Sequence, residues 1–296
     1  MTDFLPSYPH SATHPSVLLY NDHLLPTANF ALALPNRGLQ FNDGFFETLV
    51  WTSDAVRYLP YHVHRMQAAA AALHLPLPPA LADATALTTT VRRVAAANSL
   101  PEARVRIQLW RGGGGLYTPP VGAPTEYMAT ALPFQPNDQT IPQADFAHET
   151  HSFYSPLSFC KGPHALYYVR AGLERQTRGL DELLLLSTTG HVAEAVSAAV
   201  FWIRDGQLFT PALTTGCVAG VRRAHLLAIA RQQALPCQEG LFLPENLLTA
   251  EAVFTANVAG LRPIERLHEV ALASAAHPLL EALRRWDAEA TYAQPA

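Results

Sequence analysis

Lysine is nearly absent from this chain. Of the 20 basic residues, 19 are arginine, and the one lysine is Lys161. Arginine replaces lysine in surface charges and ion pairs, but a guanidinium stays protonated and does not condense with a carbonyl. A single retained lysine therefore suggests a position that needs a primary amine able to form a Schiff base. The alternative is a biased composition that left one lysine on a solvated surface.

Other scarcities exclude several classes of protein. Charged residues make up 15% of the chain, the net charge is −4, and no basic run gives the electrostatic footprint of a nucleic-acid-binding protein. Apolar runs such as residues 183–186 fall far short of a membrane span, and the N-terminus lacks a basic-then-apolar signal pattern. We therefore expect a cytoplasmic protein without a membrane or nucleic-acid partner.

Spacings typical of metal sites are also scarce. The three cysteines, Cys160, Cys217 and Cys237, show no CxxC spacing, which favours reduced thiols over a disulfide framework or a zinc site. His62 and His64 are separated by one residue, but no carboxylate or cysteine lies at a spacing that would complete a metal site with them. The sequence therefore predicts no metal site.

The composition that is present is that of a globular protein. Hydrophobic residues make up 49% of the chain, and 296 residues can form one large domain or two of ordinary size. Residues 1–15, rich in Pro, His, Ser and Thr, predict a loose arm, and residues 133–142, rich in Pro, Asn, Asp and Gln, predict a linker. The predicted domains are a small one at 16–132 and a large one at 143–296.

Hydrophobic periodicity predicts the elements of both domains. In the small domain it indicates strands at 17–20, 30–34, 104–110 and 127–132, and helices at 61–73 and 79–97. In the large domain it indicates a helix at 161–178, a strand at 183–186, a hairpin at 199–210 turning at Asp205-Gly206, and helices at 221–235 and 277–292. Both domains are therefore predicted to mix helices with strands.

Several stretches together resemble the class IV aminotransferases. They are Lys161 with its following helix, residues 179–186, residues 190–197, and residues 36–49 with an Arg-Gly, an Asp-Gly and a Glu. These relatives are pyridoxal-phosphate enzymes of fold type IV, and they include branched-chain and D-amino-acid aminotransferases and 4-amino-4-deoxychorismate lyase. The resemblance implies an α/β fold with a small N-terminal domain, a larger C-terminal domain with a mixed, barrel-like β core, and a homodimer.

The resemblance also implies roles for individual residues. Lys161 would form the Schiff base with pyridoxal phosphate, Arg65 would bind the phosphate, and Glu194 would face the pyridine nitrogen. Residues 214–223 resemble the family's phosphate cup, in which amides at a helix start hold the phosphate. Further cofactor contacts are expected from Val221, Arg222 and Asn257, and substrate contacts from Phe46, Thr48, Tyr117, Ala256 and Asn257.

This chain departs from the family pattern near its lysine. A tyrosine that hydrogen-bonds the ring oxygen in relatives is replaced here, because Ala165 and Leu166 occupy its place. Tyr167 or Tyr168 could substitute for it, but on a helix only one of them can face the ring. Arg222 likewise stands where the family has threonine, so the resemblance supports its amide contact and not a hydroxyl contact.

The sequence leaves two reactions open, transamination and the lyase reaction. Glu47 is the residue of aminotransferases, whereas Thr48 and Tyr117 match lyases. We expect an aminotransferase that acts on a small or apolar amino acid and a 2-oxo acid, with aminodeoxychorismate lyase as the alternative and a non-catalytic binding protein as a third. The stretch Ser158-Phe159-Cys160-Lys161 also fits the S-x-x-K motif of serine acylases, but that motif requires a second lysine in a later K-T-G, which this chain lacks.

Overall fold

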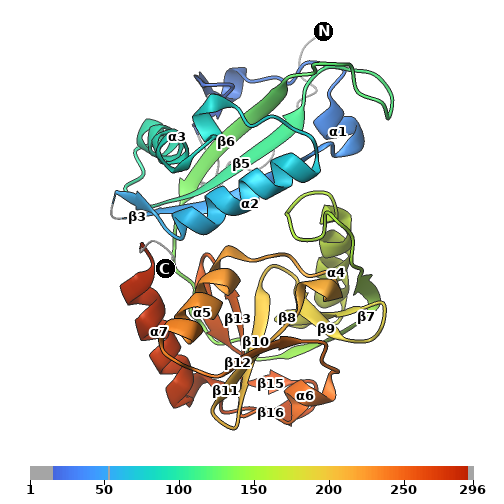
Figure 1. Cartoon of the computed structure of the whole chain (residues 1–296), viewed down its shortest axis with the longest axis vertical. Coiled ribbons are helices and arrows are strands. Elements are labelled where there is room, and N and C mark those ends of the chain that lie inside the picture. The colour runs from blue at the N-terminus through green and yellow to red at the C-terminus, as the bar shows by residue number, and fades with distance from the viewer. Residues whose placement is uncertain (1–15, 53, 293–296) are drawn as a thin grey trace.

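The computed structural model describes residues 16–52 and 54–292. The first of its three sheets has six antiparallel strands in the order β2-β1-β6-β5-β3-β4. The strands are β1 (Val17–Tyr20), β2 (His23–Pro26), β3 (Gly44–Thr52), β4 (Ala55–Val56), β5 (Ala103–Arg111) and β6 (Thr125–Pro133). Helices α2 (Leu59–Ala72) and α3 (Ala84–Ala97) cover one face of this sheet in the upper half of Figure 1.

Buried and exposed side chains alternate along β5, and this alternation distinguishes the two faces of the sheet. Val105, Ile107 and Leu109 are buried and pack in the same core cluster as Met66 of α2. Arg106, on the opposite face, is exposed. Successive side chains of a strand point to opposite faces, so the helices bury one face and leave the other polar.

The C-terminal half contains two five-stranded sheets, in the orders β12-β11-β10-β13-β14 and β16-β15-β7-β8-β9. Side chains of both sheets share one core cluster, in which Leu184 and Val192 meet Trp202 and Val253. The strands are β7 (Ala144–Ser152), β8 (Glu182–Ser187), β9 (Val192–Ala195), β10 (Ala199–Arg204), β11 (Gln207–Pro211), β12 (Cys237–Gly240), β13 (Ala252–Asn257), β14 (Gly260–Pro263), β15 (Arg266–Leu267) and β16 (Val270–Ala271). This shared core confirms the predicted mixed α/β fold with a barrel-like centre.

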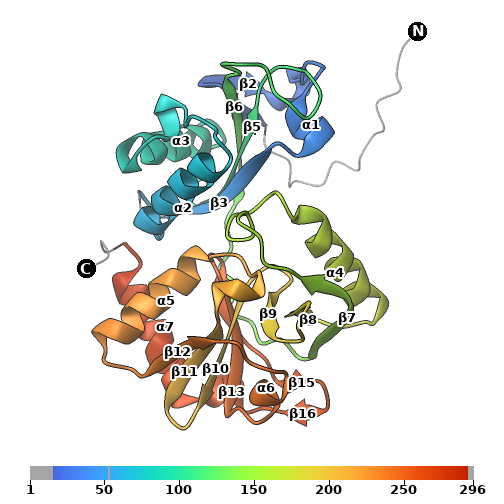
Figure 2. The same ribbon diagram turned by 45° about the vertical axis from the view of Figure 1, so that its right-hand side comes forward.

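Three longer helices surround these two sheets, as Figure 2 shows. α5 (Val221–Gln232) and α7 (Pro278–Ala290) pack on the side of β10 and β13, and α4 (Ala165–Thr177) packs on β7 and β8. The shorter helices are α1 (Arg37–Phe41), α6 (Glu245–Leu248) and the 3-10 turns η1 (Thr27–Asn29), η2 (Pro79–Leu81), η3 (Leu213–Thr215) and η4 (Ser274–Ala276). No helix in the described ranges is long and apolar enough to cross a membrane.

Several elements agree with the sequence predictions. β1 has the predicted bounds, and the hairpin of β10 and β11 turns at Asp205 and Gly206, which both have positive φ angles. β5, β6, β8, α2, α5 and α7 lie within a few residues of their predicted positions. Within the predicted linker at 133–142, Pro133 ends β6 and residues 134–142 contain no named strand or helix; the linker and the division into two domains there stay predictions.

Other elements differ from the predictions. The predicted strand at 30–34 is wrong: this segment pairs with no described strand, and Leu34 is 74% exposed. The predicted helix at 79–97 begins later, because η2 comes first and the side chain of Asp83 then caps α3. The helix predicted from Lys161 begins at Ala165, so Lys161 lies in the preceding turn. The predicted arm, residues 1–15, falls outside the described residues.

Candidate active site

Lys161 lies in a turn that docks against the start of β3. The backbone amide of Phe46 donates to the Lys161 carbonyl at 2.9 Å, and the side chain of Asn42 donates to the Gly162 carbonyl at 2.7 Å. Gly162 has a φ angle of +132°, and a Cβ atom there would lie 2.9 Å from the Cα of Phe45. Only glycine fits this backbone and this close approach, so the docking fixes the lysine beside the N-terminal sheet.

The surroundings of Lys161 favour its neutral amine. Burial lowers the pKa of Lys161 to about 8, and the Arg65 guanidinium adds to this effect. Glu47 and Glu194 oppose it. No described residue accepts a hydrogen bond from the amine, so the nucleophilic form is available near neutral pH.

Glu194 on β9 is the carboxylate of the site. It is 4% exposed, and its Oε1 accepts hydrogen bonds from the Tyr168 hydroxyl at 2.7 Å and from the Val218 amide at 3.0 Å. Burial raises the pKa of Glu194 to about 7, against the opposing effect of these two donors and of Lys161. The structure therefore brings Glu194 and Lys161 close enough to affect each other's pKa, and the role of Glu194 at the ring nitrogen stays a prediction.

The N-terminus of α5 points its free amides at the same region. Its N-cap is Gly220, and no side chain caps the first turn. The first amides of a helix have no partner within the helix and lie at the positive end of its dipole, which suits an anion. The amides of Val221 and Arg222 belong to this turn, and the guanidinium of Arg65 donates to the neighbouring Ala219 carbonyl at 2.9 Å.

Arg65 has a partner that the sequence analysis did not assign. Its Nε and Nη2 donate to the two carboxylate oxygens of Glu47 at 2.6 and 2.7 Å, and His62 Nδ1 lies 2.8 Å from Glu47 Oε2. All three side chains are buried. Burial would raise the pKa of Glu47, but Arg65 and His62 outweigh it and lower this pKa to about 2. Arg65 uses three of its five N–H donors in these contacts, so two remain for an anion.

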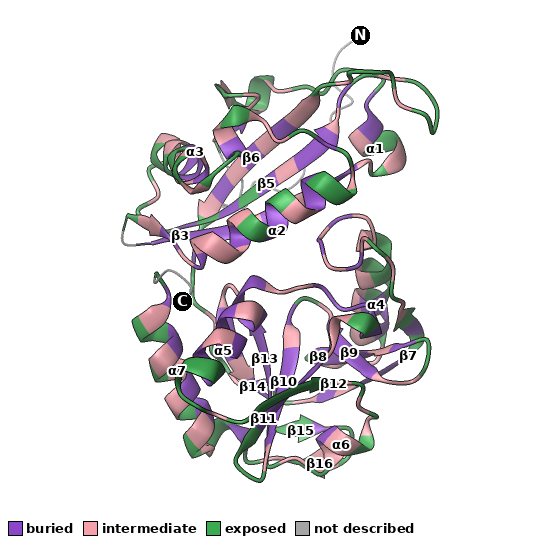
Figure 3. Ribbon diagram, viewed as in Figure 1, coloured by how far each residue is buried: buried purple, intermediate pink, exposed green. Residues whose placement is uncertain are grey.

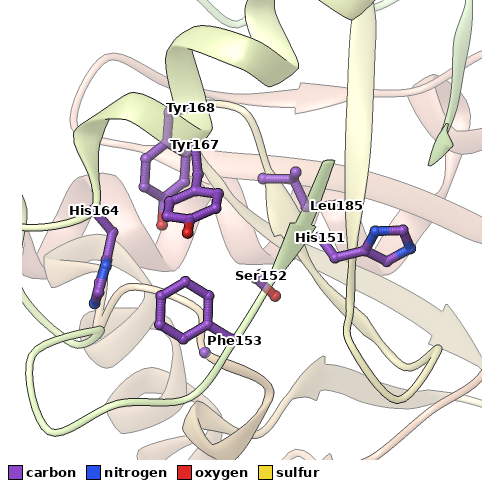
Figure 4. Close-up of a pocket in the computed structure, with 8 residues that line it drawn as sticks. His151, Ser152, Phe153, His164, Tyr167, Tyr168 and Leu185 are labelled. Atoms are coloured by element: carbon purple, nitrogen blue, oxygen red, sulfur yellow. The ribbon is translucent and has the colours of Figure 1, made fainter. Parts of the chain in front are cut away.

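The structure separates the two tyrosines that follow Lys161. Tyr168 faces inward to Glu194, whereas Tyr167 is 41% exposed and packs its ring against Phe153 at 5.2 Å. Figure 4 shows both side chains at the start of α4, together with Phe153 and His164. They line a pocket beside the site that also includes Gly216. Of the two tyrosines, Tyr168 is therefore the one that faces the site, and its hydroxyl contacts Glu194.

Phe46 and Thr48 lie on the face of the first sheet that the helices leave open. Thr48 is paired in register with Arg106 of β5, and the Arg106 guanidinium lies 3.7 Å from the centre of the Phe46 ring. Arg106 has no described ion pair, and its charge contributes to the lowered pKa of Lys161. Sequence analysis missed Arg106 as a site residue, although its position on the polar side of an alternating strand could have indicated it.

The remaining predicted site residues have other described contacts. Tyr117 is 89% exposed, and its ring packs on Phe41 at 5.5 Å, in a glycine-rich loop whose carbonyls accept hydrogen bonds from Arg37. Ala256 is buried in the core cluster beneath α5. The side chain of Asn257 closes the turn between β13 and β14 by accepting from the amides of residues 259 and 260. None of these three side chains has a described contact with Lys161.

Arg222 turns its side chain away from the first turn of α5. The guanidinium donates to Asp287 of α7 at 2.7 Å and to the Asn257 carbonyl at 3.0 Å. Its amide alone remains for an anion at the helix start, as the sequence analysis inferred from the missing threonine. Figure 3 shows buried stretches on both α5 and α7.

These groups fit the three anchoring points of pyridoxal phosphate. Lys161 offers an amine for the aldehyde, Glu194 offers a carboxylate oxygen for the ring nitrogen, and the uncapped start of α5 beside Arg65 offers donors for the phosphate. Within the described part of the chain, no group of three His, Cys, Asp or Glu residues could hold a metal ion. The donor set thus suits an organic phosphate with an aldehyde.

Comparisons with known proteins show the family of this chain. The family model "Amino-transferase class IV" matches residues 44–267. An aminodeoxychorismate lyase of Vibrio harveyi is 27% identical over 247 residues, which cover 78% of this chain and 85% of the lyase. A branched-chain-amino-acid aminotransferase of Escherichia coli K12 is 24% identical over 209 residues, which cover 67% of this chain and 66% of that enzyme.

Solved structures of similar fold include branched-chain aminotransferases. The enzyme of Escherichia coli superposes with a TM-score of 0.83 at 20% identity, covering 94% of each chain. The enzyme of Thermobaculum terrenum in its PLP-form superposes with a TM-score of 0.81 at 19% identity, again covering 94% of each chain. At these identities the likeness establishes the fold.

Proposed function

Because the chain belongs to the class IV aminotransferase family, we propose that it is a pyridoxal-phosphate-dependent aminotransferase whose reactive amine is Lys161. One observation carries the proposal. Lys161, Glu194 and the uncapped start of α5 converge, and they supply the amine, the carboxylate and the phosphate donors that this cofactor needs. The proposed reaction is the exchange of an amino group between a small or apolar amino acid and a 2-oxo acid.

Each residue has a distinct part in this reaction. The bound cofactor supplies an electron sink that stabilises negative charge on the substrate carbon. Lys161 holds the cofactor and, once released, moves a proton as a general base, for which a pKa of about 8 is well placed. Glu194 keeps the ring nitrogen protonated, and Arg65 with the amides of Val221 and Arg222 orients the phosphate.

Arg106 is the proposed anchor for a substrate carboxylate. It lies on the open face of the sheet, near Lys161 and over the ring of Phe46, and it has no described ion pair. A guanidinium matches a carboxylate through two parallel N–H donors. The Phe46 ring beside it offers apolar surface, which supports a substrate with a small or apolar side chain.

Chemical trapping tests the assignment of Lys161. Borohydride reduction of the protein with pyridoxal phosphate, followed by peptide mapping, should place the adduct on Lys161. The Lys161→Arg variant keeps the positive charge but should give no adduct, because a guanidinium does not condense with an aldehyde. A protein that gains no absorbance band with added cofactor would overturn the proposal.

Two further variants test the other anchors. Glu194→Gln should keep the cofactor but lose most turnover, because a neutral ring stabilises the negative charge poorly. Arg65→Ala should instead weaken cofactor retention. The reverse pattern would show that these two roles are assigned wrongly.

The alternative reaction is that of an aminodeoxychorismate lyase. It is favoured by Thr48, which matches a lyase residue and lies opposite Arg106, and by the relative in Vibrio harveyi. A panel of L- and D-amino acids with 2-oxoglutarate or pyruvate, run beside aminodeoxychorismate, separates the two. Conversion of the bound cofactor to its amine form by an ordinary amino acid supports transamination, whereas release of 4-aminobenzoate without that conversion supports the lyase.

We further propose a homodimer and a boundary between two domains at residues 133–142. The large exposed apolar side chains Leu166, Val169 and Leu173 on α4 are consistent with a covered surface in an assembly. Analytical ultracentrifugation of the active protein tests the first proposal, and an active monomer would exclude it. Limited proteolysis within residues 133–142 tests the second.

A further inference from the structure

We propose that Tyr168 is a positioning residue that fixes the Glu194 carboxylate with one oxygen held by the protein and the other turned toward the cofactor ring. This inference rests on the proposed function, because it specifies how Glu194 meets the ring nitrogen. It assigns Tyr168 to the carboxylate and not to the ring oxygen, the role that the missing tyrosine has in relatives.

The two oxygens have different surroundings. Oε1 accepts both described hydrogen bonds, from the Tyr168 hydroxyl at 2.7 Å and from the Val218 amide at 3.0 Å. Oε2 accepts none from the described residues, yet it is not among the polar atoms sealed from solvent without a partner. Two donors on one oxygen restrict the rotation of the carboxylate and leave Oε2 as the acceptor without a described protein partner.

The direction in which each residue of α4 points explains why Tyr168 contacts Glu194. Leu166, at the family's tyrosine position, is 71% exposed, so that position points to solvent in this chain. Tyr168 is two residues further along the helix, which is about 200° of rotation, and so it points inward. Ala171, one turn beyond it, is fully buried on the same side.

The charge of Glu194 also depends on this contact. Burial raises the pKa of Glu194 to about 7, and the hydroxyl of Tyr168, the Val218 amide and the positive charges of Lys161 and Arg223 counteract it. Burial and Glu194 raise the pKa of Tyr168, so its hydroxyl stays protonated and donates. A donor favours the ionised carboxylate, which is the form that accepts a bond from a protonated ring nitrogen.

The first experiment needs no cofactor. The carboxyl carbon of Glu194 is titrated by NMR in protein labelled with 13C-glutamate, and its signal is identified by its loss in Glu194→Gln. Tyr168→Phe should shift the titration of Glu194 to higher pH, because one donor to the charged form is lost. Tyr167→Phe is the matched control: it removes the same hydroxyl from the neighbouring exposed residue and should leave the titration unchanged. An unchanged titration in Tyr168→Phe would overturn the inference.

The second experiment separates the carboxylate from the ring oxygen. Binding of pyridoxal phosphate is compared with binding of an analogue that has carbon in place of the ring nitrogen. Tyr168→Phe should weaken the binding of pyridoxal phosphate about tenfold, the usual effect of a hydrogen bond to a charged group, and leave binding of the analogue unchanged. Equal losses for both ligands would place the hydroxyl on the ring oxygen and overturn the inference.

A double-mutant comparison completes the test. In the Glu194→Gln background, Tyr168→Phe should have a much smaller effect on cofactor binding, because residues that act through one contact are not additive. Full additivity would contradict a role through Glu194. If the wild-type protein does not bind pyridoxal phosphate at all, the proposed function fails, and the cofactor-free titration still decides whether Tyr168 controls Glu194.

Discussion

Asp287 joins the C-terminal helix α7 to α5 through a buried ion pair and to Tyr58, just before α2, through a hydrogen bond. Replacing Asp287 by alanine is a sharp test of this packing. Its carboxylate accepts from Arg222 at 2.7 and 3.2 Å and from the Tyr58 hydroxyl at 3.1 Å. The side chains of Asp287 and Arg222 are only 2% and 5% exposed. Asp287→Ala would therefore leave a buried guanidinium without its counter-charge.

The expected loss of stability in Asp287→Ala follows from the low exposure of Asp287 and Arg222. Removing one partner of a buried ion pair typically destabilises a protein by about 3–5 kcal/mol, because the remaining charge is uncompensated. The matched control is Glu281→Ala on the same helix. Glu281 pairs with Arg284 at 3.0 Å, but the Glu281 side chain is 62% exposed. An exposed pair contributes about 0–1 kcal/mol, and the position of Glu281 in the first turn of α7 adds about 0.3–1 kcal/mol from the helix dipole.

Urea denaturation followed by circular dichroism measures both free energies of unfolding. Asp287→Ala should lower the free energy of unfolding several times more than Glu281→Ala does. The double variant Arg222→Met with Asp287→Leu should recover much of the loss, because removing both buried charges together is often nearly neutral. Equal, small effects for Asp287→Ala and Glu281→Ala would refute the reasoning, since the buried pair would then be no different from an exposed one.

Three further predictions concern the site. Burial and Arg65 lower the pKa of Lys161 to about 8, so the rate of pyridoxal phosphate capture, followed by stopped-flow absorbance, should rise through pH 8 and then level off; a rate that keeps rising toward pH 10.5 would contradict this. Gly162→Ala should abolish pyridoxal phosphate capture, because its φ is +132° and an added Cβ would lie 2.9 Å from the Cα of Phe45. Gly172→Ala should leave capture intact, because an added Cβ there has no atom within 4 Å. Equal capture by both variants would disprove the docking of this turn. Glu47 has a pKa lowered from 4.5 to about 2, so its contribution to stability is complete above pH 4.5 and is lost as the pH falls toward 2. Urea titrations should show the largest gap between wild type and Glu47→Gln near neutral pH, and a gap that grows on acidification would refute this.

Local sequence was sufficient for much of the fold. The hairpin at Asp205-Gly206, the alternating strand β5 and the amphipathic α7 were predicted correctly, because each depends on residues that are neighbours in the chain. The prediction of a strand at 30–34 was wrong because a strand also depends on residues that are distant in the chain. An apolar run becomes a strand only if it finds a partner strand, and this one has none among the described residues.

Contacts between distant residues escaped the sequence analysis. Glu47 and Arg65 are 18 residues apart, and Arg222 and Asp287 are 65 apart, so no local pattern pairs them. Arg106 became a site residue only because β5 lies beside β3 in the sheet. Each of these contacts depends on how separate elements pack, and packing is a property of the folded chain.

The sequence by itself determined which residue could perform the chemistry. Lys161 is the chain's only primary amine on a side chain, and no arginine can replace it in a Schiff base, so a Schiff base formed by a side chain of this chain would have to use Lys161. The tertiary structure alone decided what surrounds that amine. The burial that lowers its pKa accompanies the docking of its turn against β3. The inward position of Tyr168 and its contact with Glu194 depend on how α4 packs beside β9.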